Sequence, residues 1–507
     1  MPAFHRFAAL AAAVSLLAPV IARATDDYLL ASSSQPTALK LCRGGADDTL
    51  DPAACQKAGY DVLVTAIDTA FTSLLNRTPA NVRPLLKRDE FWFDEIILSA
   101  GADGLPEDFA DTLRQRATTL ADIAAGFGRP GYLGHWVNVT GKLDVTAVDA
   151  GGYRLAIETR TTYGADVDRR RECKVTAQVA AGAGGWLTGT VLPDQDRPAA
   201  PKTTPDKTTP DSAAAETAKP VMIKIRRQGE TLRVVVSGQP FEDDNRPNCK
   251  SMFQITGSYF AGGKDANATD KADIGFVTPT FDCMRPETAS DEEMCADPDL
   301  ADNDQRLNRA WEALLPRLDE ATRRALMQDQ RGWVHAQALQ YPEFLHPDWE
   351  KRTYFMHYTA DSRAKLDQLQ RERIALFEGF DDKRTGIAGV WIAHNAIINV
   401  TADKDGISAK GWKWQQGSWK DGCDYDMSGD LVGGVFHSAG KGKNPDTLER
   451  DHATLIINRQ DDAFAAKRKP GADEDEWKCK RVPSSSSTAR LFPARASPDI
   501  SDFDDIR

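Results

Sequence analysis

Eight cysteines carry most of the reactive chemistry that this sequence offers. Cysteines can bind a metal, form a redox pair or form structural disulfides, and their spacing separates the three cases. Zinc sites and thioredoxin-type redox sites usually place two cysteines, or a cysteine and a histidine, within one turn of the chain. No CxxC or CxxH spacing occurs here. The spacing therefore favours structural disulfides.

Acidic and histidine residues offer two further kinds of site, a hydrolase or a metal centre. Glycoside hydrolysis needs two carboxyl groups fixed across a cleft, whereas Asp243–Asp244 and Asp291–Glu292 lie in polar runs typical of solvated loops. A group of imidazoles and carboxylates would suit zinc, but it contains no HExxH motif. We therefore predict no catalytic residues, no metal and no cofactor. The group consists of His335, His346, Asp348, Glu350 and His357.

Three tryptophans lie close together in the stretch GWKWQQGSW: Trp412, Trp414 and Trp419. An exposed aromatic strip of this kind could stack on the sugar rings of peptidoglycan. The alternative is that the rings pack inside a small β module, where aromatics supply most of the apolar mass. The three residues are kept as possible binding residues.

The first residues indicate export. His5 and Arg6 form a polar start, Phe7 to Ile21 is apolar, and Ala22-Arg23-Ala24 is a small-x-small cleavage site. This pattern predicts a signal peptide at 1–24, and hence a periplasmic or secreted bacterial protein in which disulfides are stable. An uncleaved anchor is the alternative, but the apolar run is short and interrupted. No later stretch is apolar enough to cross a membrane.

The elements that position these residues fall into helical and β segments. Apolar residues recur at helical spacing after Cys55 and Cys295, whereas stretches such as KLDVTAV alternate apolar and polar residues. We predict an α+β multidomain protein in which small disulfide-stapled helical hairpin or bundle units alternate with small antiparallel β modules. The predicted units are a helical unit at 38–128, β modules at 131–192 and 221–278 joined by a disordered linker at 193–220, a helical domain at 279–378, a C-terminal β module at 385–481 and a disordered tail at 482–507.

The chain also repeats a pattern. Two pairs of cysteines close loops of nearly equal length, Cys42–Cys55 and Cys283–Cys295, and a tryptophan follows each pair at a similar distance. These tryptophans are Trp92 and Trp333. The repeat predicts the two disulfides, and it makes the helical unit at 38–128 a possible decayed copy of the one at 279–378.

The other four cysteines are assigned less directly. Cys423 and Cys479 lie in the last β module, so we predict that they pair. A Cys173–Cys249 disulfide then follows by elimination, and it would join two β modules across the linker.

The segment at about 280–375 resembles the N-terminal domain of the LprI-type lysozyme inhibitors, a family of secreted bacterial proteins. Two departures are that Asn303 replaces a usual apolar residue and that two further cysteines of the family are missing after Trp333. The resemblance implies a protein that binds and blocks a lysozyme. The matching positions are Phe281, Asp282, Cys283, Cys295, Asp297, Pro298, Leu300, Asp304, Leu307, Trp311, Gln330, Trp333, Arg373 and Ile374.

The net charge of −12 is compatible with this implication. Many lysozymes are basic, so an acidic partner would meet them faster, although acidity also simply aids solubility. An acidic surface argues against nucleic-acid binding. We therefore expect an exported, non-enzymatic binding protein that inhibits a lysozyme or related muramidase. The alternatives are an envelope protein that binds peptidoglycan or another envelope protein, and a hydrolase with an unrecognised site.

Overall fold

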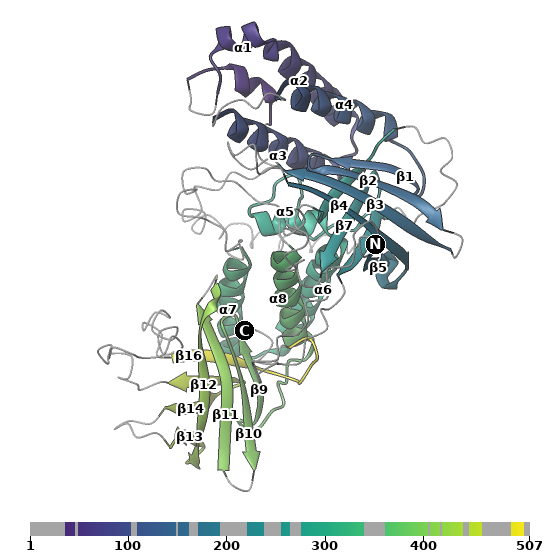
Figure 1. Ribbon diagram of the computed structural model, residues 1–507. Coiled ribbons are helices and arrows are strands. Elements are labelled where there is room, and N and C mark those ends of the chain that lie inside the picture. The colour runs from purple at the N-terminus through teal and green to yellow at the C-terminus, as the bar shows by residue number, and fades with distance from the viewer. Residues whose placement is uncertain are drawn as a thin grey trace, which may run out of the picture.

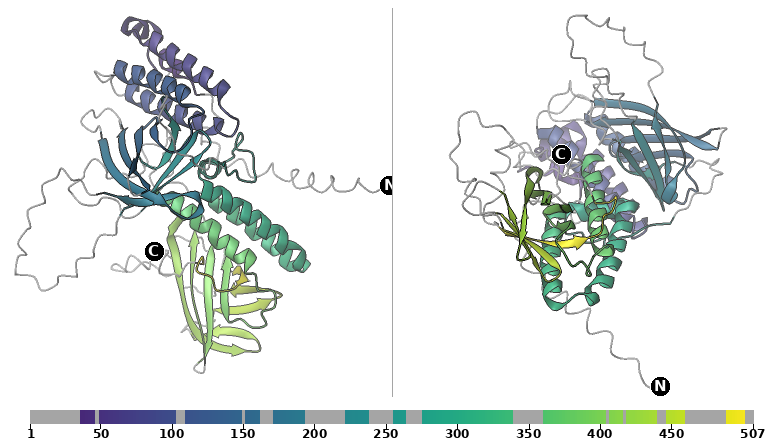
Figure 2. Two further views of the ribbon diagram at one scale, coloured as in Figure 1. Left: turned by 90° about the vertical axis from the view of Figure 1, so that its right-hand side faces the viewer. Right: turned by 90° about the horizontal axis from the view of Figure 1, so that it is seen from below.

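The structure, a computed structural model, describes residues 36–45, 49–102, 109–148, 151–161, 171–192, 221–237, 255–263, 275–338, 360–403, 406–415, 418–439, 446–458 and 488–500. These residues form helices and antiparallel strands, as predicted, and the strands close into two barrels. A helical unit precedes each barrel along the chain (Figure 1). Figure 1 and the left view of Figure 2 both place the second helical unit between the two barrels.

The first helical unit forms because its helices each bury one apolar face. In α2, Ile67, Phe71 and Leu74 lie on that face and are buried. Gly59 ends α1 in the left-handed conformation, with φ of 73°, which glycine adopts without strain. α2 packs mainly against α4 rather than against the next helix, α3. The elements are η2 (Ala38–Cys42), α1 (Pro52–Ala58), α2 (Tyr60–Arg77), α3 (Arg83–Ala102) and α4 (Phe109–Gly126).

The first barrel encloses alternating apolar side chains such as Leu143 and Val145, with Trp136 fully buried among them. The Trp136 indole N–H donates to the Tyr132 carbonyl at 2.8 Å, which satisfies its only polar group. Each strand pairs antiparallel with the next, and β1 pairs with β8 to close the ring. The strands are β1 (Gly134–Asn138), β2 (Gly141–Val148), β3 (Gly152–Thr161), β4 (Arg171–Ala181), β5 (Leu187–Val191), β6 (Met222–Gln228), β7 (Thr231–Ser237) and β8 (Gly257–Ala261).

This barrel corrects the prediction of two separate β modules at 131–192 and 221–278. β5 and β6 pair directly, with Leu187 opposite Ile225, so strands on both sides of the predicted linker share one sheet. Separate modules of a few strands each would leave unpaired edges, and closure removes them. The linker at 193–220 lies outside the described residues.

The second helical unit follows the same order as the first. Its helices are α5 (Ala289–Ala296), α6 (Pro298–Leu314), α7 (Glu320–Ala338) and α8 (Ala360–Glu378), with a short 3₁₀ turn, η7 (Leu315–Arg317), after α6. α6 packs mainly against α8, as α2 packs against α4. In both units, therefore, the first long helix pairs with the last one and does not form the predicted hairpin with its neighbour.

The second barrel is built like the first, around the buried indole of Trp391, whose N–H donates to the Ile387 carbonyl at 2.7 Å. Its last strand corrects the prediction of a disordered tail at 482–507, because residues 488–494 pair with both β15 and β9 and close the ring. The strands are β9 (Gly389–Ala393), β10 (Ala396–Asp403), β11 (Gly406–Gln415), β12 (Ser418–Val432), β13 (Val435–Ser438), β14 (Thr447–Asp451), β15 (Thr454–Asn458) and β16 (Thr488–Ala494).

The two helical units correspond residue by residue over much of their length. Cys55 and Cys295, Leu86 and Leu326, and Asp89 and Asp329 are separated by the same number of residues, and each pair is buried in its own unit. The same spacing matches Phe93, not Trp92, to Trp333. Arg116 lies over the Phe93 ring at 5.2 Å and Arg373 over the Trp333 ring at 5.9 Å. The predicted correspondence of Trp92 with Trp333 is therefore off by one residue.

Disulfides join Cys42 to Cys55 and Cys283 to Cys295, the two pairings predicted from the repeat. Cys249 and Cys479 lie outside the described residues. The pairings Cys173–Cys249 and Cys423–Cys479 therefore stay predictions. Disulfides are typical of proteins that mature in an oxidising compartment.

Candidate functional site

The apolar residues of the family-like pattern lie inside the second helical unit. Leu300, Leu307 and Trp333 are buried there, and Phe281 packs against the cluster that contains Leu300. The Trp311 ring lies 5.1 Å from the ring of Phe377 on α8. Leu300, Leu307 and Trp333 therefore hold the unit together and do not offer their side chains to a partner.

Two aspartates of the pattern fix the segment that leads into α5. Asp304 accepts hydrogen bonds from the Thr280 backbone N–H at 2.6 Å and from the Thr280 hydroxyl at 2.7 Å. Asp282 accepts one from the Met284 N–H at 2.9 Å. Both carboxylates satisfy backbone donors next to the Cys283–Cys295 disulfide, so their role in this structure is to hold the disulfide-closed loop.

Asp297 does more than the other pattern residues. It is the N-cap of α6, where it accepts from the backbone N–H groups of Asp299 at 3.1 Å and Leu300 at 3.4 Å. It also binds the Arg363 guanidinium through both carboxylate oxygens, at 2.6 and 2.8 Å. Burial alone would raise the pKa of Asp297, but the adjacent guanidinium groups, Arg363 first, hold that pKa well below its ordinary value.

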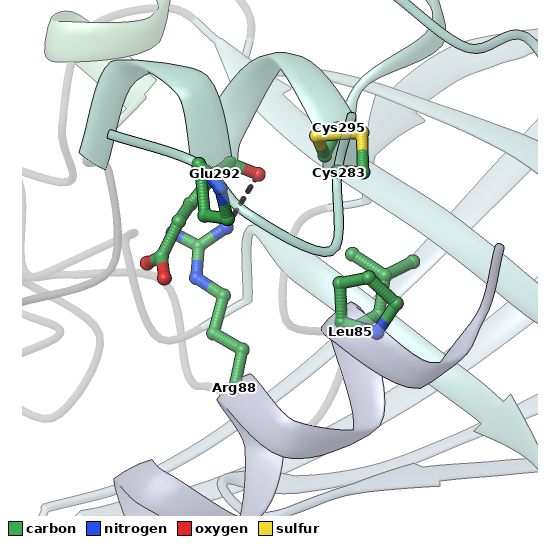
Figure 3. Close-up of a pocket in the computed structure, with 7 residues that line it drawn as sticks. Leu85, Arg88, Cys283, Glu292 and Cys295 are labelled. Carbon is green, nitrogen blue, oxygen red and sulfur yellow. Dashed lines mark hydrogen bonds between the residues drawn. A yellow bond between two sulfur atoms is a disulfide. The ribbon is translucent and has the colours of Figure 1, made fainter. Parts of the chain in front are cut away.

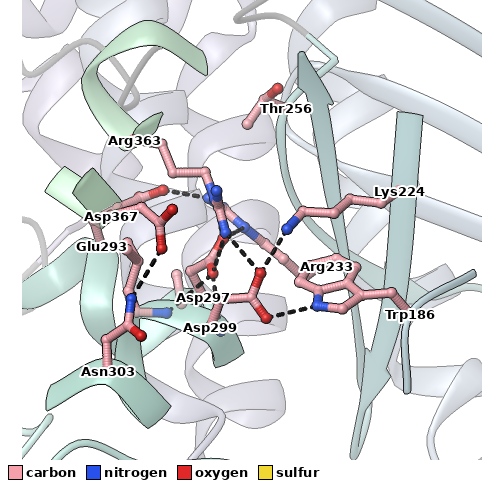
Figure 4. A network of polar contacts seen from close by, with 12 residues as sticks. Trp186, Lys224, Arg233, Thr256, Glu293, Asp297, Asp299, Asn303, Arg363 and Asp367 are labelled. Atoms are coloured by element: carbon pink, nitrogen blue, oxygen red, sulfur yellow. Dashed lines mark hydrogen bonds and ion pairs between the residues drawn. The ribbon is translucent and has the colours of Figure 1, made fainter. Parts of the chain in front are cut away.

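The network around Asp297 joins the second helical unit to the first barrel. Arg233 on β7 donates to Asp297 at 3.2 Å and also pairs with Glu293 on α5 (Figure 4). All three side chains are almost completely buried. Because buried charges are costly unless they are paired, this contact holds only in one relative position of barrel and helices.

A second, less buried part of the network surrounds Asp299 (Figure 4). The Asp299 carboxylate accepts from the Lys224 ammonium at 2.5 Å and from the Trp186 indole N–H at 2.7 Å. Lys224 also lies over the Trp186 ring at 4.2 Å. Trp186 follows the turn between β4 and β5, and Lys224 lies on β6. One end of the first barrel therefore rests on the start of α6.

The chain has two halves, each made of a helical unit and the barrel that follows it. A small pocket lies between α3 of the first half and α5 of the second half (Figure 3). The Cys283–Cys295 disulfide lines it together with Leu85 and Arg88. Arg88 donates to the Glu293 carboxylate at 3.0 Å and to the Glu292 carbonyl at 3.5 Å. The pocket has a volume of about 10 Å³, which holds one water molecule at most. This place is a contact between the two halves and offers no room for a substrate.

A buried arginine–aspartate pair links each helical unit to its own barrel. Arg373 donates to Asp329 at 2.7 Å and to Gln330 at 2.7 Å, and Asp329 also accepts from the His394 backbone N–H at 2.9 Å. His394 lies in the turn between β9 and β10. Burial would raise the pKa of Asp329, but Arg373 and His394 lower it below its ordinary value.

The first half has the same arrangement at the corresponding position. Arg116 donates to Asp89 at 2.9 Å, and Asp89 accepts from the Val139 N–H at 2.8 Å in the turn between β1 and β2. Glu90 also binds Arg116, and burial raises the pKa of Glu90 above its ordinary value. In both halves a carboxylate in the middle of the unit therefore binds an arginine and a barrel turn at once.

Several predicted sites are not described. The backbones of Trp412, Trp414 and Trp419 lie in β11 and β12, but their side chains are outside the described part of the structure. His335 lies in the last turn of α7, while residues 346–357 of the histidine group are not described. Within the described ranges, no group of three or more His, Cys, Asp or Glu residues is arranged to hold a metal. Among the described helices, none combines the length and apolar character needed to span a bilayer.

The partners of Asp297 and Asp299 were not predicted. Only Arg233 could have been suspected from the sequence. It is the one charged residue among the apolar residues of the strand TLRVVVS, and an arginine buried there needs an acidic partner. Lys224, Trp186, Arg88 and Arg363 carry no such signal. They lie far from Asp297 in the sequence; the packing of α8 against α6 brings Arg363 to it, and the packing of the two halves brings the other three.

Residues 283–374 match the profile of the family described as Lysozyme inhibitor LprI. The match confirms the resemblance predicted from the sequence, and it covers the second helical unit from the first cysteine of its disulfide to Ile374, four residues before the end of α8. No curated protein and no solved structure matches the chain significantly.

Proposed function

We propose that the protein is an exported, non-enzymatic binding protein that inhibits a lysozyme or a related muramidase through its second helical unit. The observation that supports this proposal is the family match at 283–374, together with the positions of the pattern residues. A disulfide closes the loop ahead of α5, and Leu300, Leu307 and Trp333 form the interior, as a folded member of the family requires.

The partner would contact side chains that the fold leaves uncovered. Asp297 and Glu293 are buried beneath the first barrel, so they are not available to a muramidase. The outer face of α7 is exposed at Arg324, Met327 and Val334 and lies within the matched region. We therefore place the inhibitory contact on exposed side chains of the second helical unit.

The proposal is tested by adding the purified mature protein to lysozyme acting on a suspension of bacterial cell walls. We expect the loss of turbidity to slow in proportion to the added protein, until the inhibitor is in excess. A direct binding measurement with the same lysozyme should give a one-to-one or simple multiple stoichiometry. Unchanged lysis with the protein in large excess, across several classes of muramidase, would rule out inhibition.

Two tryptophan variants assign the activity to one half. Trp333→Ala opens a cavity in the second helical unit, and Trp136→Ala opens one in the first barrel; each should cost about 3–5 kcal/mol of stability. We expect inhibition to be lost with Trp333→Ala and kept with Trp136→Ala, at a temperature where circular dichroism shows the rest of the chain folded. The reverse result would place the inhibitory contact in the first half.

A further inference from the structure

The centre of the first helical unit holds two carboxyl groups for one guanidinium. Asp89 and Glu90 on α3 both bind Arg116 on α4, whose Nη2 lies 2.9 Å from an Asp89 oxygen and 2.7 Å from Oε2 of Glu90. All three residues are buried, and none is more than 5% exposed. A buried charge is costly unless an opposite charge balances it. With both carboxyl groups ionised, this group would carry one negative charge too many.

One oxygen of Glu90 accepts no hydrogen bond. Oε2 accepts from Nε of Arg116 at 3.1 Å as well as from Nη2, whereas the buried Oε1 has no donor among the residues that the structure describes. A charged oxygen that loses water without gaining a donor is expensive to bury. A proton on Oε1 removes the charge and leaves Oε2 to accept from Arg116. The geometry therefore favours the neutral acid form of Glu90.

The charges around Glu90 act in the same direction. Burial raises the pKa of Glu90, Arg116 opposes the rise, and Asp89 and the α2 residue Asp68 add to it. Within the described part of the chain, Arg116 is the only cation bonded to Glu90. The other titratable groups on α3 and the elements packed around it are an ion pair with η2, a buried phenol of the barrel and an ion pair with α5: Lys40 with Asp94, Tyr259, and Arg88 with Glu293.

The second helical unit has no such surplus of charge. Gln330 follows Asp329 there as Glu90 follows Asp89, and its amide oxygen accepts from Arg373 at 2.7 Å. Asp329 and Arg373 then balance each other. A neutral side chain at this position therefore satisfies the arginine and is compatible with the fold. The neutral acid form of Glu90 offers the arginine the same kind of oxygen.

Ionisation of Glu90 would disturb the contacts that fix α3. An ionised Glu90 competes with Asp89 for Arg116, and Asp89 is the residue that ties α3 to the barrel through the Val139 N–H. Arg88 lies two residues before Glu90 on the same helix and reaches across to the carboxylate of α5 in the second half at 3.0 Å. A shift of α3 would therefore reach the contact between the two halves.

We infer that Glu90 is a proton-controlled switch: as a neutral acid it holds α3 in place, and when it ionises α3 and the contact between the two halves loosen together. The folded unit keeps the proton to a higher pH than the opened unit does. Opening therefore becomes easier as the pH rises from the unfolded pKa, near 4, to the folded pKa of Glu90. Over that interval the opening constant rises by up to about tenfold per pH unit, and above it the constant no longer changes.

Hydrogen exchange of the full mature chain, followed by mass spectrometry over a series of pH values, tests the inference. After correction for the chemical pH dependence of amide exchange, peptides from α3 and α5 should open more readily as the pH rises, whereas peptides from β14 and β15 should not. Glu90→Gln mimics the neutral acid and should abolish the rise. Glu378→Gln is the matched control, because it removes a carboxylate that binds Arg306 through both oxygens at the exposed surface, and it should keep the rise.

A second readout follows the proton itself. The difference infrared spectrum between the wild type and Glu90→Gln, taken just above the pH at which exposed carboxyl groups ionise, should contain the carbonyl band of one protonated carboxyl group. Absence of that band would overturn the inference, as would opening of α3 that is independent of pH in the wild type or that depends on pH equally in Glu90→Gln. Loosening of α3 without any change in α5 would also overturn it, because the contact between the halves would then not depend on Glu90.

Discussion

Asp297 shows how one carboxylate can serve three contacts. It caps α6, binds Arg363 within its own unit, and binds Arg233 of the first barrel. The cap could be read from the sequence, because Asp followed by Pro typically starts a helix. The two arginines could not, since nothing in the local pattern distinguishes a capping aspartate from one that also holds a buried ion pair.

Replacing Asp297 with Asn should be strongly destabilising. The amide can still cap α6, but Arg363 and Arg233 would keep buried positive charge without a full counter-charge. Removing one partner of a buried pair typically costs about 3–5 kcal/mol. Urea unfolding followed by circular dichroism measures the change. Asp111→Asn is the control, because Asp111 lies on the exposed surface of α4 and should change stability by less than about 0.5 kcal/mol. Equal effects of the two substitutions would contradict the assigned role.

The lowered pKa values of Asp297 and Asp329 predict how stability depends on pH. A carboxyl group whose pKa is lower in the folded state stabilises the fold at every pH above its unfolded pKa, near 4. That stability is lost as the pH falls below this value. We expect the free energy of unfolding to be steady near neutral pH and to fall steeply below about pH 4. The Asp297→Asn variant should show a shallower fall, and an unchanged slope would count against this explanation.

The disulfide-closed loop is the element that the sequence predicted best. Two cysteines at this spacing in an exported chain have few other uses, and the pairing needed no knowledge of the tertiary structure. The barrels are the opposite case. Alternation identified many of their strands, but closure pairs β1 with β8 and β9 with β16, and alternation carries no information about which distant strand is the partner. The last strand, in TARLFPA, was missed because it is short and its neighbours are rich in serine and proline.

The two disulfides allow a matched comparison. Their sequence separations are 13 and 12, so removing either one should cost about 3 kcal/mol of unfolded-state entropy in the simple chain model. The Cys283–Cys295 loop also packs against α3, whereas α1 is exposed. Replacing both cysteines with serine should therefore destabilise the chain more at 283 and 295 than at 42 and 55. Thermal unfolding of the two double variants measures the difference. Equal losses would mean that the loop adds nothing to the contact between the two halves.

The cooperative unfolding of the whole molecule depends on the buried ion pairs between its two halves. Arg233→Met keeps most of the side-chain volume but removes one cation from Glu293 and Asp297, which still bind Arg88 and Arg363. We expect the halves to lose their mutual support while each stays folded, so that one unfolding transition separates into two. Differential scanning calorimetry resolves this. Lys142→Met is the control, since Lys142 forms an exposed ion pair on the first barrel. A single transition in both variants would argue against a contact between the halves that Arg233 holds.

The sequence revealed the repeat of the helical units, but not that two closed barrels share one strand order. Cysteine spacing survives divergence because a disulfide needs both partners, whereas barrel strands keep only their alternation and exchange almost every side chain. The repeat of the barrels is visible in a few shared contacts. The indole N–H groups of Trp136 and Trp391, for example, each donate a hydrogen bond to the carbonyl four residues earlier. The family-like pattern found one copy of the helical unit because only that copy keeps the polar residues of the pattern.

The position of β16, which closes the second barrel, has a consequence for how the protein folds during synthesis. The first barrel has all its strands once Ala261 has been made, but the second remains an open sheet, with one edge of β9 and one edge of β15 unpaired, until Ala494 follows. Open edges invite pairing with other chains. A chain emerging from its amino end would therefore pass through a vulnerable interval after nearly all of it has been synthesised. A small loss at the carboxyl end, by a protease or a premature stop, would make that interval permanent.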